Sequence, residues 1–157
     1  ALARAYPDIG FVQIGGRPED IAYWEDQTLP DKNIHFIPQV DSETLKLLLA
    51  SADLLFLPIS RKNNKTWWCQ SPMKVFDYLE SSVPIIGSCV GSTTEILSDS
   101  MFTRYKEEDI SDAKVKFAYA LQNYDKLKKA SFWHAEFVRK NLTWNARVKK
   151  ILRHLSE

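Results

Sequence analysis

The sequence lacks the features that mark several large classes of protein. Its two cysteines, Cys69 and Cys89, form no CxxC pair and have no histidine-rich neighbourhood. They therefore predict reduced thiols in a cytoplasmic protein and no metal site. No apolar run reaches the length of a membrane-spanning helix, and no segment resembles a signal peptide. We expect at most peripheral contact with a membrane surface.

Charge and catalytic motifs exclude further classes. The net charge is +1, from 21 Lys and Arg against 20 Asp and Glu, so no nucleic-acid partner is expected. The patterns G-x-x-x-x-G-K-[ST], G-x-G-x-x-G and G-x-S-x-G, which mark P-loop, dinucleotide and hydrolase sites, are missing. The histidines are scattered along the chain, and we expect each to be structural or exposed rather than catalytic.

What is present is an alternation of short apolar strands and amphipathic helices. The chain has 157 residues, 45% of them hydrophobic, which predicts one globular domain. The alternation predicts an α/β fold, a Rossmann-like parallel sheet with helices on both faces, followed by a helical tail over about 107–157. Strands are expected at 11–14, 34–37, 54–57 and 84–87, with a weak one at 101–105; helices are expected at 18–27, 42–52, 72–82, 107–123, 125–141 and 143–155.

The helix over 72–82 is the most informative segment. Ser71 can serve as its N-cap, and Pro72 occupies the first helical position, where a missing N–H costs nothing. The free N–H groups at such an end attract anions, phosphates above all. The alternative is an ordinary capped helix of an α/β domain.

The ends of the expected strands define a ligand edge. Parallel sheets bind ligands outside the carboxyl ends of their strands. Gly15-Gly16, residues 38–40, residues 58–70 and Ser88-Cys89 follow the strands, and the helix at Ser71 starts on the same edge. The anion-binding interpretation is thereby strengthened. The loop at 59–69 carries three basic residues, which are either solvated or include one that reaches a phosphate; these are Arg61, Lys62 and Lys65.

Four stretches in this order resemble the C-terminal, nucleotide-sugar-binding half of a GT-B glycosyltransferase, most closely the retaining family 4 (glycosyl transferases group 1). They are FVQIGGRPE, IHFIPQVDSETLKLLLASADLLFLP, SPMKVFDYLESSVPIIGS and VGSTTEIL. The terminal NLTWNARVKKIL resembles the closing tryptophan-bearing helix of that half. Together the stretches cover nearly the whole chain.

The resemblance implies roles for individual residues. Asp77 takes the position of the acid that holds the donor ribose hydroxyls, while Glu80, three residues later, is expected to face solvent. The family's other acid, which contacts the transferred sugar, falls on Cys69. Because a thiol cannot replace a carboxylate as an acceptor, that contact is either lost or taken by Gln70.

The remaining donor contacts follow the same resemblance. The N–H groups of Ser71 and Met73 would receive the diphosphate, and Lys74 either adds charge there or faces solvent. Gln39 and Val40 match the loop that meets the nucleobase through backbone atoms. Gly15 and Gly16 allow close approach of the backbone after the first strand. The family's usual glycines are replaced by Pro38 and Ser82.

Two parts of the family pattern have no counterpart. One is the first strand of this half with its diphosphate-gripping arginine and lysine, which would be central in a doubly wound sheet. The other is the acceptor-binding N-terminal half. We therefore expect a fragment of a longer two-domain protein, with no catalytic residue within this chain. If the chain stands alone, its sheet must be arranged differently or be completed by a partner chain.

The implied function is sugar transfer from a nucleoside-diphosphate sugar to an acceptor hydroxyl, in carbohydrate biosynthesis. Positioning and charge stabilisation of the leaving diphosphate would do most of the work, with no metal or other cofactor. The expected partners are a nucleotide sugar and the acceptor-binding domain. Three alternatives remain: a nucleotide-sugar epimerase of the same architecture, a degenerate module that only binds a nucleotide, and a receiver-like interaction domain.

Overall fold

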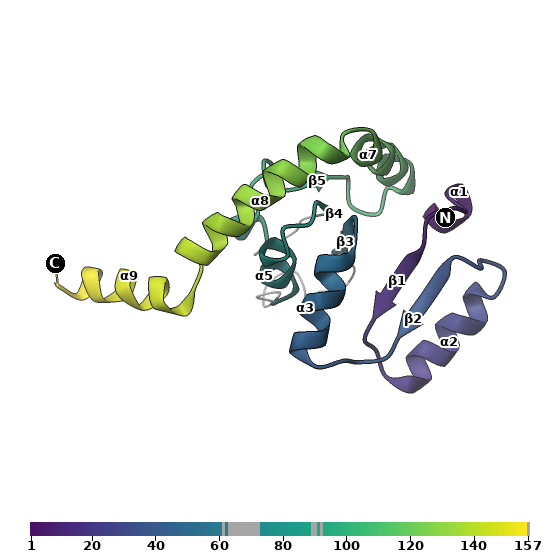
Figure 1. The fold of residues 1–157 in the computed structure, drawn as a ribbon, viewed down its shortest axis with the longest axis horizontal. Helices are drawn as coiled ribbons and strands as arrows, with labels where there is room; N and C mark the ends of the chain where they lie inside the picture. The colour runs from purple at the N-terminus through teal and green to yellow at the C-terminus, as the bar shows by residue number, and fades with distance from the viewer. Residues whose placement is uncertain (61, 63–72, 89–90, 92, 157) are drawn as a thin grey trace. The chain divides into compact units, whose positions relative to one another are not determined.

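The computed structural model describes residues 1–60, 62, 73–88, 91 and 93–156, and it confirms parallel strands flanked by helices (Figure 1). The described elements, in chain order, are α1 (Leu2–Ala5), β1 (Phe11–Ile14), α2 (Pro18–Thr28), β2 (Ile34–Ile37), α3 (Ser42–Ser51), β3 (Leu55–Pro58), α5 (Met73–Glu80), β4 (Ile85–Ser88), α6 (Thr93–Ile96), β5 (Thr103–Arg104), α7 (Ile110–Gln122), α8 (Tyr124–Asn141) and α9 (Trp144–Ser156).

The chain divides into two compact units, Ala1–Leu47 and Leu48–Glu157. The strands divide in the same way, into a two-stranded sheet β1-β2 and a three-stranded sheet β3-β4-β5, both parallel. Among the described strands, β1 and β3 each pair with one neighbour, so each has one edge without a partner. The single domain predicted over 1–157 stays a prediction.

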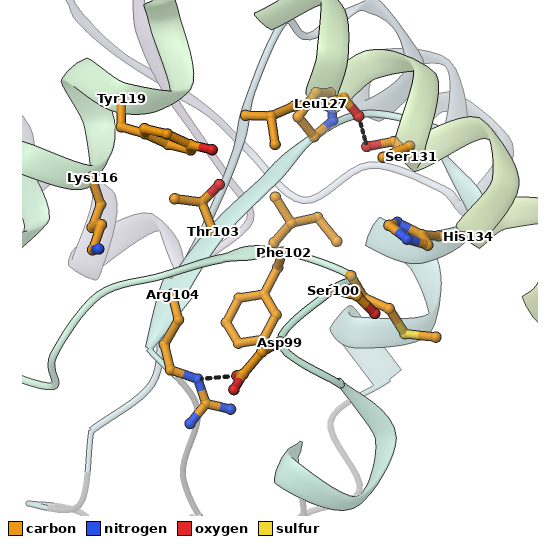
Figure 2. Close-up of a pocket in the computed structure, with 14 residues that line it drawn as sticks. Asp99, Ser100, Phe102, Thr103, Arg104, Lys116, Tyr119, Leu127, Ser131 and His134 are labelled. Carbon is orange, nitrogen blue, oxygen red and sulfur yellow. Dashed lines mark hydrogen bonds and ion pairs between the residues drawn. The ribbon is translucent and has the colours of Figure 1, made fainter. Parts of the chain in front are cut away.

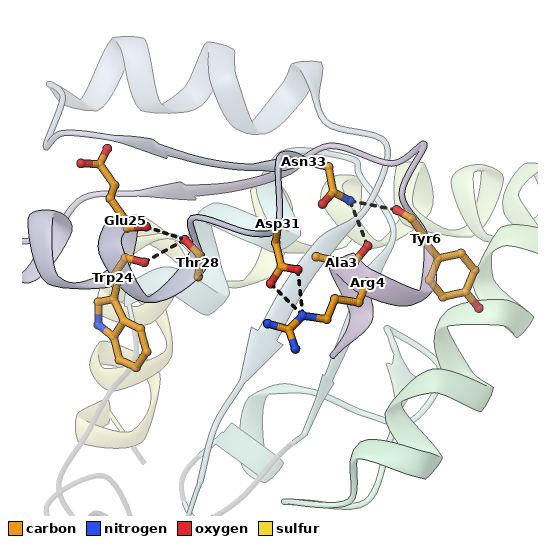
Figure 3. A network of polar contacts seen from close by, with 8 residues as sticks. All are labelled: Ala3, Arg4, Tyr6, Trp24, Glu25, Thr28, Asp31 and Asn33. Carbon is orange, nitrogen blue, oxygen red and sulfur yellow. Dashed lines mark hydrogen bonds and ion pairs between the residues drawn. The ribbon is translucent and has the colours of Figure 1, made fainter.

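Unit 1 (Ala1–Leu47) is held together by a polar side chain as well as by its sheet. The register of β1 on β2 runs from Phe11 opposite Ile34 to Ile14 opposite Ile37. Just before β2, the amide of Asn33 donates to three carbonyls of the first nine residues, at 3.0, 2.9 and 2.8 Å, those of Ala3, Tyr6 and Ile9. Figure 3 shows Asn33 beside Ala3 and Tyr6, with the Arg4–Asp31 ion pair of 2.8 Å next to it. These contacts fasten α1 to the sheet.

Unit 2 (Leu48–Glu157) contains nearly all of the buried core. Leu55 and Leu57 of β3 are buried, and all four residues of β4 are buried. The strands approach closely at Gly87, where an added Cβ would lie 2.9 Å from the carbonyl oxygen of Leu57. On α5, Val75 and Leu79 turn inward, and α5 packs against α8. α7 lies against β4 and β5.

Two residues with positive φ set helix boundaries. Glu108 has φ of 59°, so the helix expected from 107 begins instead at Ile110, with the Asp109 side chain accepting a hydrogen bond from the N–H of Asp112. Residues 107 and 108 could not be helical because a left-handed residue interrupts the α conformation. Ser82 has φ of 60° just after α5, which is where helices commonly end on glycine.

Among the described residues, no helix is both long and apolar enough to cross a membrane.

Candidate functional site

The carboxyl ends of β3, β4 and β5 carry a polar cluster in unit 2. Ser88, at the end of β4, is 2% exposed. Its hydroxyl accepts from the Ile59 N–H at 2.9 Å and donates to the Ile59 carbonyl at 2.6 Å. This pair of bonds ties the chain leaving β3 to the end of β4. It positions the start of the following loop at the edge where parallel sheets bind ligands.

Tyr105 follows β5 and covers the same cluster. Its ring stacks on Phe56 of β3, with centroids 5.5 Å apart and planes 4° from parallel. Burial raises the pKa of the Tyr105 phenol, and a hydrogen bond with Ser88 acts in the opposite direction. The phenol is therefore neutral at physiological pH and available as a hydrogen-bond partner.

Glu108 occupies the outer part of this edge. Its carboxylate accepts from the Ser60 hydroxyl and pairs with the Lys62 ammonium at 2.8 Å. The hydrogen bonds from Lys62 and Ser60 lower the pKa of Glu108, and the carboxylate in turn raises the pKa of Lys62. For Lys62 the structure supports neither interpretation of the basic loop fully. Its side chain is 82% exposed, yet its ammonium is paired with Glu108. Arg61 and Lys65 lie outside the described residues.

The helix α5 brings the predicted donor residues toward this edge. Met73 and Lys74 are exposed in its first turn, and Asp77 is half-buried one turn later. Because Lys74 and Asp77 are three residues apart, their side chains lie on neighbouring positions of one helix face. Glu80 is exposed, as expected of the residue that competes with Asp77 for the ribose role.

The start of this helix is only partly described. Cys69, Gln70 and Ser71 lie outside the described residues, as does Pro72. The N-cap, the diphosphate contact at Ser71 and the sugar contact at Cys69 or Gln70 therefore stay predictions.

The other predicted contacts lie in unit 1, at the carboxyl ends of β1 and β2. Gly15 and Gly16 have φ of 84° and 129°, so both need the conformational freedom of glycine. The Gly15 N–H donates to the Ile37 carbonyl at 2.9 Å, which holds the turn after β1 beside the end of β2. Gln39 is exposed and Val40 half-buried just beyond it. The structure thus brings these four residues to one edge of the β1-β2 sheet.

Sequence reasoning placed Ser88 at the unit 2 edge without giving it a role, and it missed two further residues of that edge, Tyr105 and Glu108. Ser88 has a local signal, since a serine that closes a fully buried strand needs hydrogen-bond partners. Glu108 and Lys62 are 46 positions apart, and no pattern in the chain links them. Among the described residues, no group of three or more His, Cys, Asp or Glu is placed to hold a metal ion. The expectation that the protein needs no metal stays a prediction.

A pocket of about 300 Å³ lies elsewhere in unit 2, between β5, α7 and α8 (Figure 2). Pro84 and Ile85, at the amino end of β4, line it together with Thr103 and Arg104 of β5. Arg104 pairs with Asp99 at 2.8 Å at its rim. This pocket is separate from the residues predicted to bind the donor.

Comparison with solved structures decides the fold. The chain matches sucrose-phosphate synthase from Thermosynechococcus elongatus with a TM-score of 0.75 at 15% identity, over 98% of this chain and 41% of that one. It matches Anabaena HepE in complex with UDP-glucose with a TM-score of 0.73 at 12% identity, over 99% and 43%. A glycosyltransferase from Rickettsia africae matches with a TM-score of 0.72 at 14% identity, over 97% and 41%.

This chain has the fold of the C-terminal half of a GT-B glycosyltransferase. It spans about 41% to 43% of the length of these three solved chains. No protein-family model and no curated protein sequence matches it. The donor residues were predicted at the carboxyl ends of the strands and at the start of the helix that is α5. The observed alternation of parallel strands and helices agrees with the order expected from the motifs.

Proposed function

We propose that this chain is the donor-binding domain of a glycosyltransferase that transfers a sugar from a nucleoside-diphosphate sugar to an acceptor hydroxyl. The observation that carries the proposal is the placement of Lys74 and Asp77 on one face of α5, in a domain whose fold neighbours are glycosyltransferases. One neighbour, Anabaena HepE, has been solved with UDP and with UDP-glucose. The chemistry that this function needs is anion binding at a helix start beside a carboxylate.

The division of roles follows from what each group can donate or accept. Asp77 accepts hydrogen bonds from the two ribose hydroxyls, and the N–H groups of Ser71 and Met73 donate to the diphosphate. Lys74 adds positive charge to the same end of the helix. Gly15 and Gly16 let the backbone come close to the ligand, and Gln39 and Val40 meet the base through backbone atoms.

Transfer itself requires groups that this chain does not supply. We propose that an acceptor-binding domain outside these 157 residues completes the active site and that no metal takes part. The edges of β1 and β3 that lack a partner among the described strands support completion by a further strand, because exposed edges in an apolar sheet invite pairing. Charge stabilisation of the leaving diphosphate is then the main contribution of this domain.

Titration with nucleotides tests the donor site. We expect the protein at its natural full length to bind at least one of UDP, GDP and ADP, as measured by calorimetry. Asp77→Ala should weaken that binding about tenfold to a hundredfold, because a hydrogen bond to a charged group contributes about 1.5–3 kcal/mol. Glu80→Ala is the matched control, since it removes an exposed acid from the same helix and should leave the affinity within about twofold.

The outcomes separate the parts of the proposal. If no nucleotide binds, the transferase function is wrong. If nucleotide binds and Asp77→Ala has no effect, the ribose role is wrong. A module that binds nucleotide without catalysis is the second candidate, favoured by Cys69 at the position of the sugar-contacting acid. Detectable sugar transfer by the full-length wild-type protein would exclude it, and a gain of transfer in Cys69→Glu would show that the substitution limits the sugar contact.

A further inference from the structure

Glu108 has a backbone conformation that a glutamate disfavours. Its φ is 59°, in the left-handed region that glycine adopts without strain. The residue lies between β5 and α7, where glycine could make the same turn. Strained residues of this kind persist where other contacts hold them, and they cluster at functional sites. The chain therefore carries a carboxylate at a position where glycine would strain the backbone less.

The carboxylate of Glu108 meets the chain that leaves β3 across the end of β4. In the sheet of unit 2, β4 lies between β3 and β5. Glu108 follows β5, yet it accepts a hydrogen bond from the hydroxyl of Ser60, which follows β3. Neighbouring strands lie about 4.8 Å apart, so this contact bridges strand ends that are about 10 Å apart. The carboxylate thus lies at the carboxyl edge of this sheet, where parallel sheets bind ligands.

Among the described residues, two groups fix the carboxylate of Glu108. The Ser60 hydroxyl donates to Oε1, and the Lys62 ammonium lies 2.8 Å from Oε2. Ser60 also accepts from the Lys62 N–H at 3.1 Å, so the three residues hold one another in place. A carboxylate can accept about four hydrogen bonds, and the Glu108 side chain is 36% exposed. It can therefore accept further hydrogen bonds from a ligand at this edge.

Lys62 also sets the charge that this edge presents to a ligand. Hydrogen bonds from Lys62 and Ser60 lower the pKa of Glu108, so its carboxylate is ionised at physiological pH and only accepts hydrogen bonds. The paired ammonium offsets the negative charge, which would otherwise repel a diphosphate at the same edge. Neutral hydroxyl groups meet no such repulsion, so they are the ligand groups that suit this acceptor best.

We infer that Glu108 accepts hydrogen bonds from the hydroxyl groups of the sugar in the donor, a neutral sugar such as a hexose. The inference rests on the proposed function, which assigns the ribose to Asp77 and the diphosphate to N–H groups at the start of α5. The sugar hydroxyls are the hydrogen-bond donors that lie beyond that diphosphate. The segment that Glu108 holds after β3 leads into α5, so the chain connects the carboxylate to the diphosphate site. Glu108 is then a donor-binding residue.

Paired titrations test the sugar contact. The natural full-length protein is titrated by calorimetry with UDP, GDP and ADP, and with the matching sugar nucleotides UDP-glucose, GDP-mannose and ADP-glucose. We expect Glu108→Gly to weaken binding of the sugar nucleotide about tenfold to a hundredfold, as the loss of hydrogen bonds to a charged group does. The free nucleoside diphosphate should keep its affinity within about twofold of the wild-type value, because it carries no sugar.

The variants are chosen so that the fold is kept. Glycine accepts a φ of 59° without strain, so Glu108→Gly removes the carboxylate and leaves the backbone path intact. Glu108→Gln keeps the shape of the side chain without its charge, and it should weaken the sugar nucleotide severalfold. The matched control is Glu136→Gln on α8, where an acid that is 37% exposed also pairs with a cation at 2.8 Å. It should leave both affinities unchanged. Circular dichroism checks that each variant folds.

The outcomes distinguish this inference from the proposed function. If the wild-type protein binds no nucleoside diphosphate, the proposed function fails and this inference fails with it. If it binds a nucleoside diphosphate but not the matching sugar nucleotide, the sugar contact is wrong although the nucleotide site exists. The sugar contact is also wrong if Glu108→Gly leaves the sugar nucleotide unaffected. If this variant weakens both ligands equally, Glu108 only holds the segment that leads into α5, and the inference is overturned.

Discussion

His134 on α8 shows how a single side chain can make stability depend on pH. Its ring nitrogen Nδ1 is buried and has no hydrogen-bond partner among the described residues. Burial lowers the pKa of His134 from its ordinary value of 6.5. The folded protein therefore resists protonation that the unfolded chain accepts.

The sign of the pH dependence follows from linkage. Above pH 6.5 the imidazole is neutral in both states, and as pH falls below 6.5 the unfolded chain takes up the proton first. We therefore expect the free energy of unfolding to fall between pH 7 and pH 5, and to fall less in His134→Gln. Urea denaturation at a series of pH values measures this. His35→Gln, at an exposed strand position, is the control. If both variants change the pH dependence of the free energy of unfolding equally, His134 is not its source.

The β3-β4 pair illustrates packing at the scale of elements. Gly87 sits where the two strands are closest, and an added Cβ would lie 2.9 Å from the Leu57 carbonyl oxygen and 3.0 Å from its Cβ. The obstacle is largely backbone, which cannot turn aside as a flexible side chain can. Ser88, the next residue, holds the same pair together through Ile59.

Substitution of Gly87 should be costly for that reason. We expect Gly87→Ala to lower the free energy of unfolding by about 1–3 kcal/mol, the usual cost of overpacking a core. Gly10→Ala adds the same methyl group where nothing lies within 4 Å, and should change stability far less. Thermal unfolding compares the two. Equal melting temperatures for the two variants would contradict this prediction, because they would mean that β3 and β4 can move apart to admit the methyl group with no loss of stability.

At the scale of the whole molecule, the two compact units differ in how much core they have. Among the described buried apolar residues, Ala3 is the one that belongs to unit 1, and the others belong to unit 2. Burial of apolar surface is the main favourable contribution to folding, and it offsets the conformational entropy that the chain loses. Unit 1 therefore relies on its sheet and on polar contacts such as those of Asn33.

Hydrogen exchange should reveal this difference. We expect backbone amides in β1 and β2 to exchange faster than those in β4, because segments with few buried apolar contacts open at lower free energy. Mass spectrometry of peptides covering each strand measures the rates. Bound nucleotide should slow exchange after β1 and β2 if the donor site is as proposed. Equal protection of β1 and β4 in the free protein would contradict the expected order.

Much of the fold was predictable because its signals are local. Apolar runs before prolines and glycines located the strands at 11–14 and 34–37 to the residue. The Asp41 side chain, which accepts from the Glu43 and Thr44 N–H groups, set the start of α3. The start of α7 was misplaced because a left-handed Glu108 depends on the long-range bonds of its side chain to Ser60 and Lys62.

The sequence by itself determined the alternation of parallel strands and helices, and with it the edge at which Asp77 and Lys74 lie, since periodicity and capping act within a few residues. Only the tertiary structure decided which partner neutralises Lys62 and which strands pair. Those outcomes depend on contacts between residues far apart in the chain, and such contacts follow from how the elements pack rather than from any local pattern.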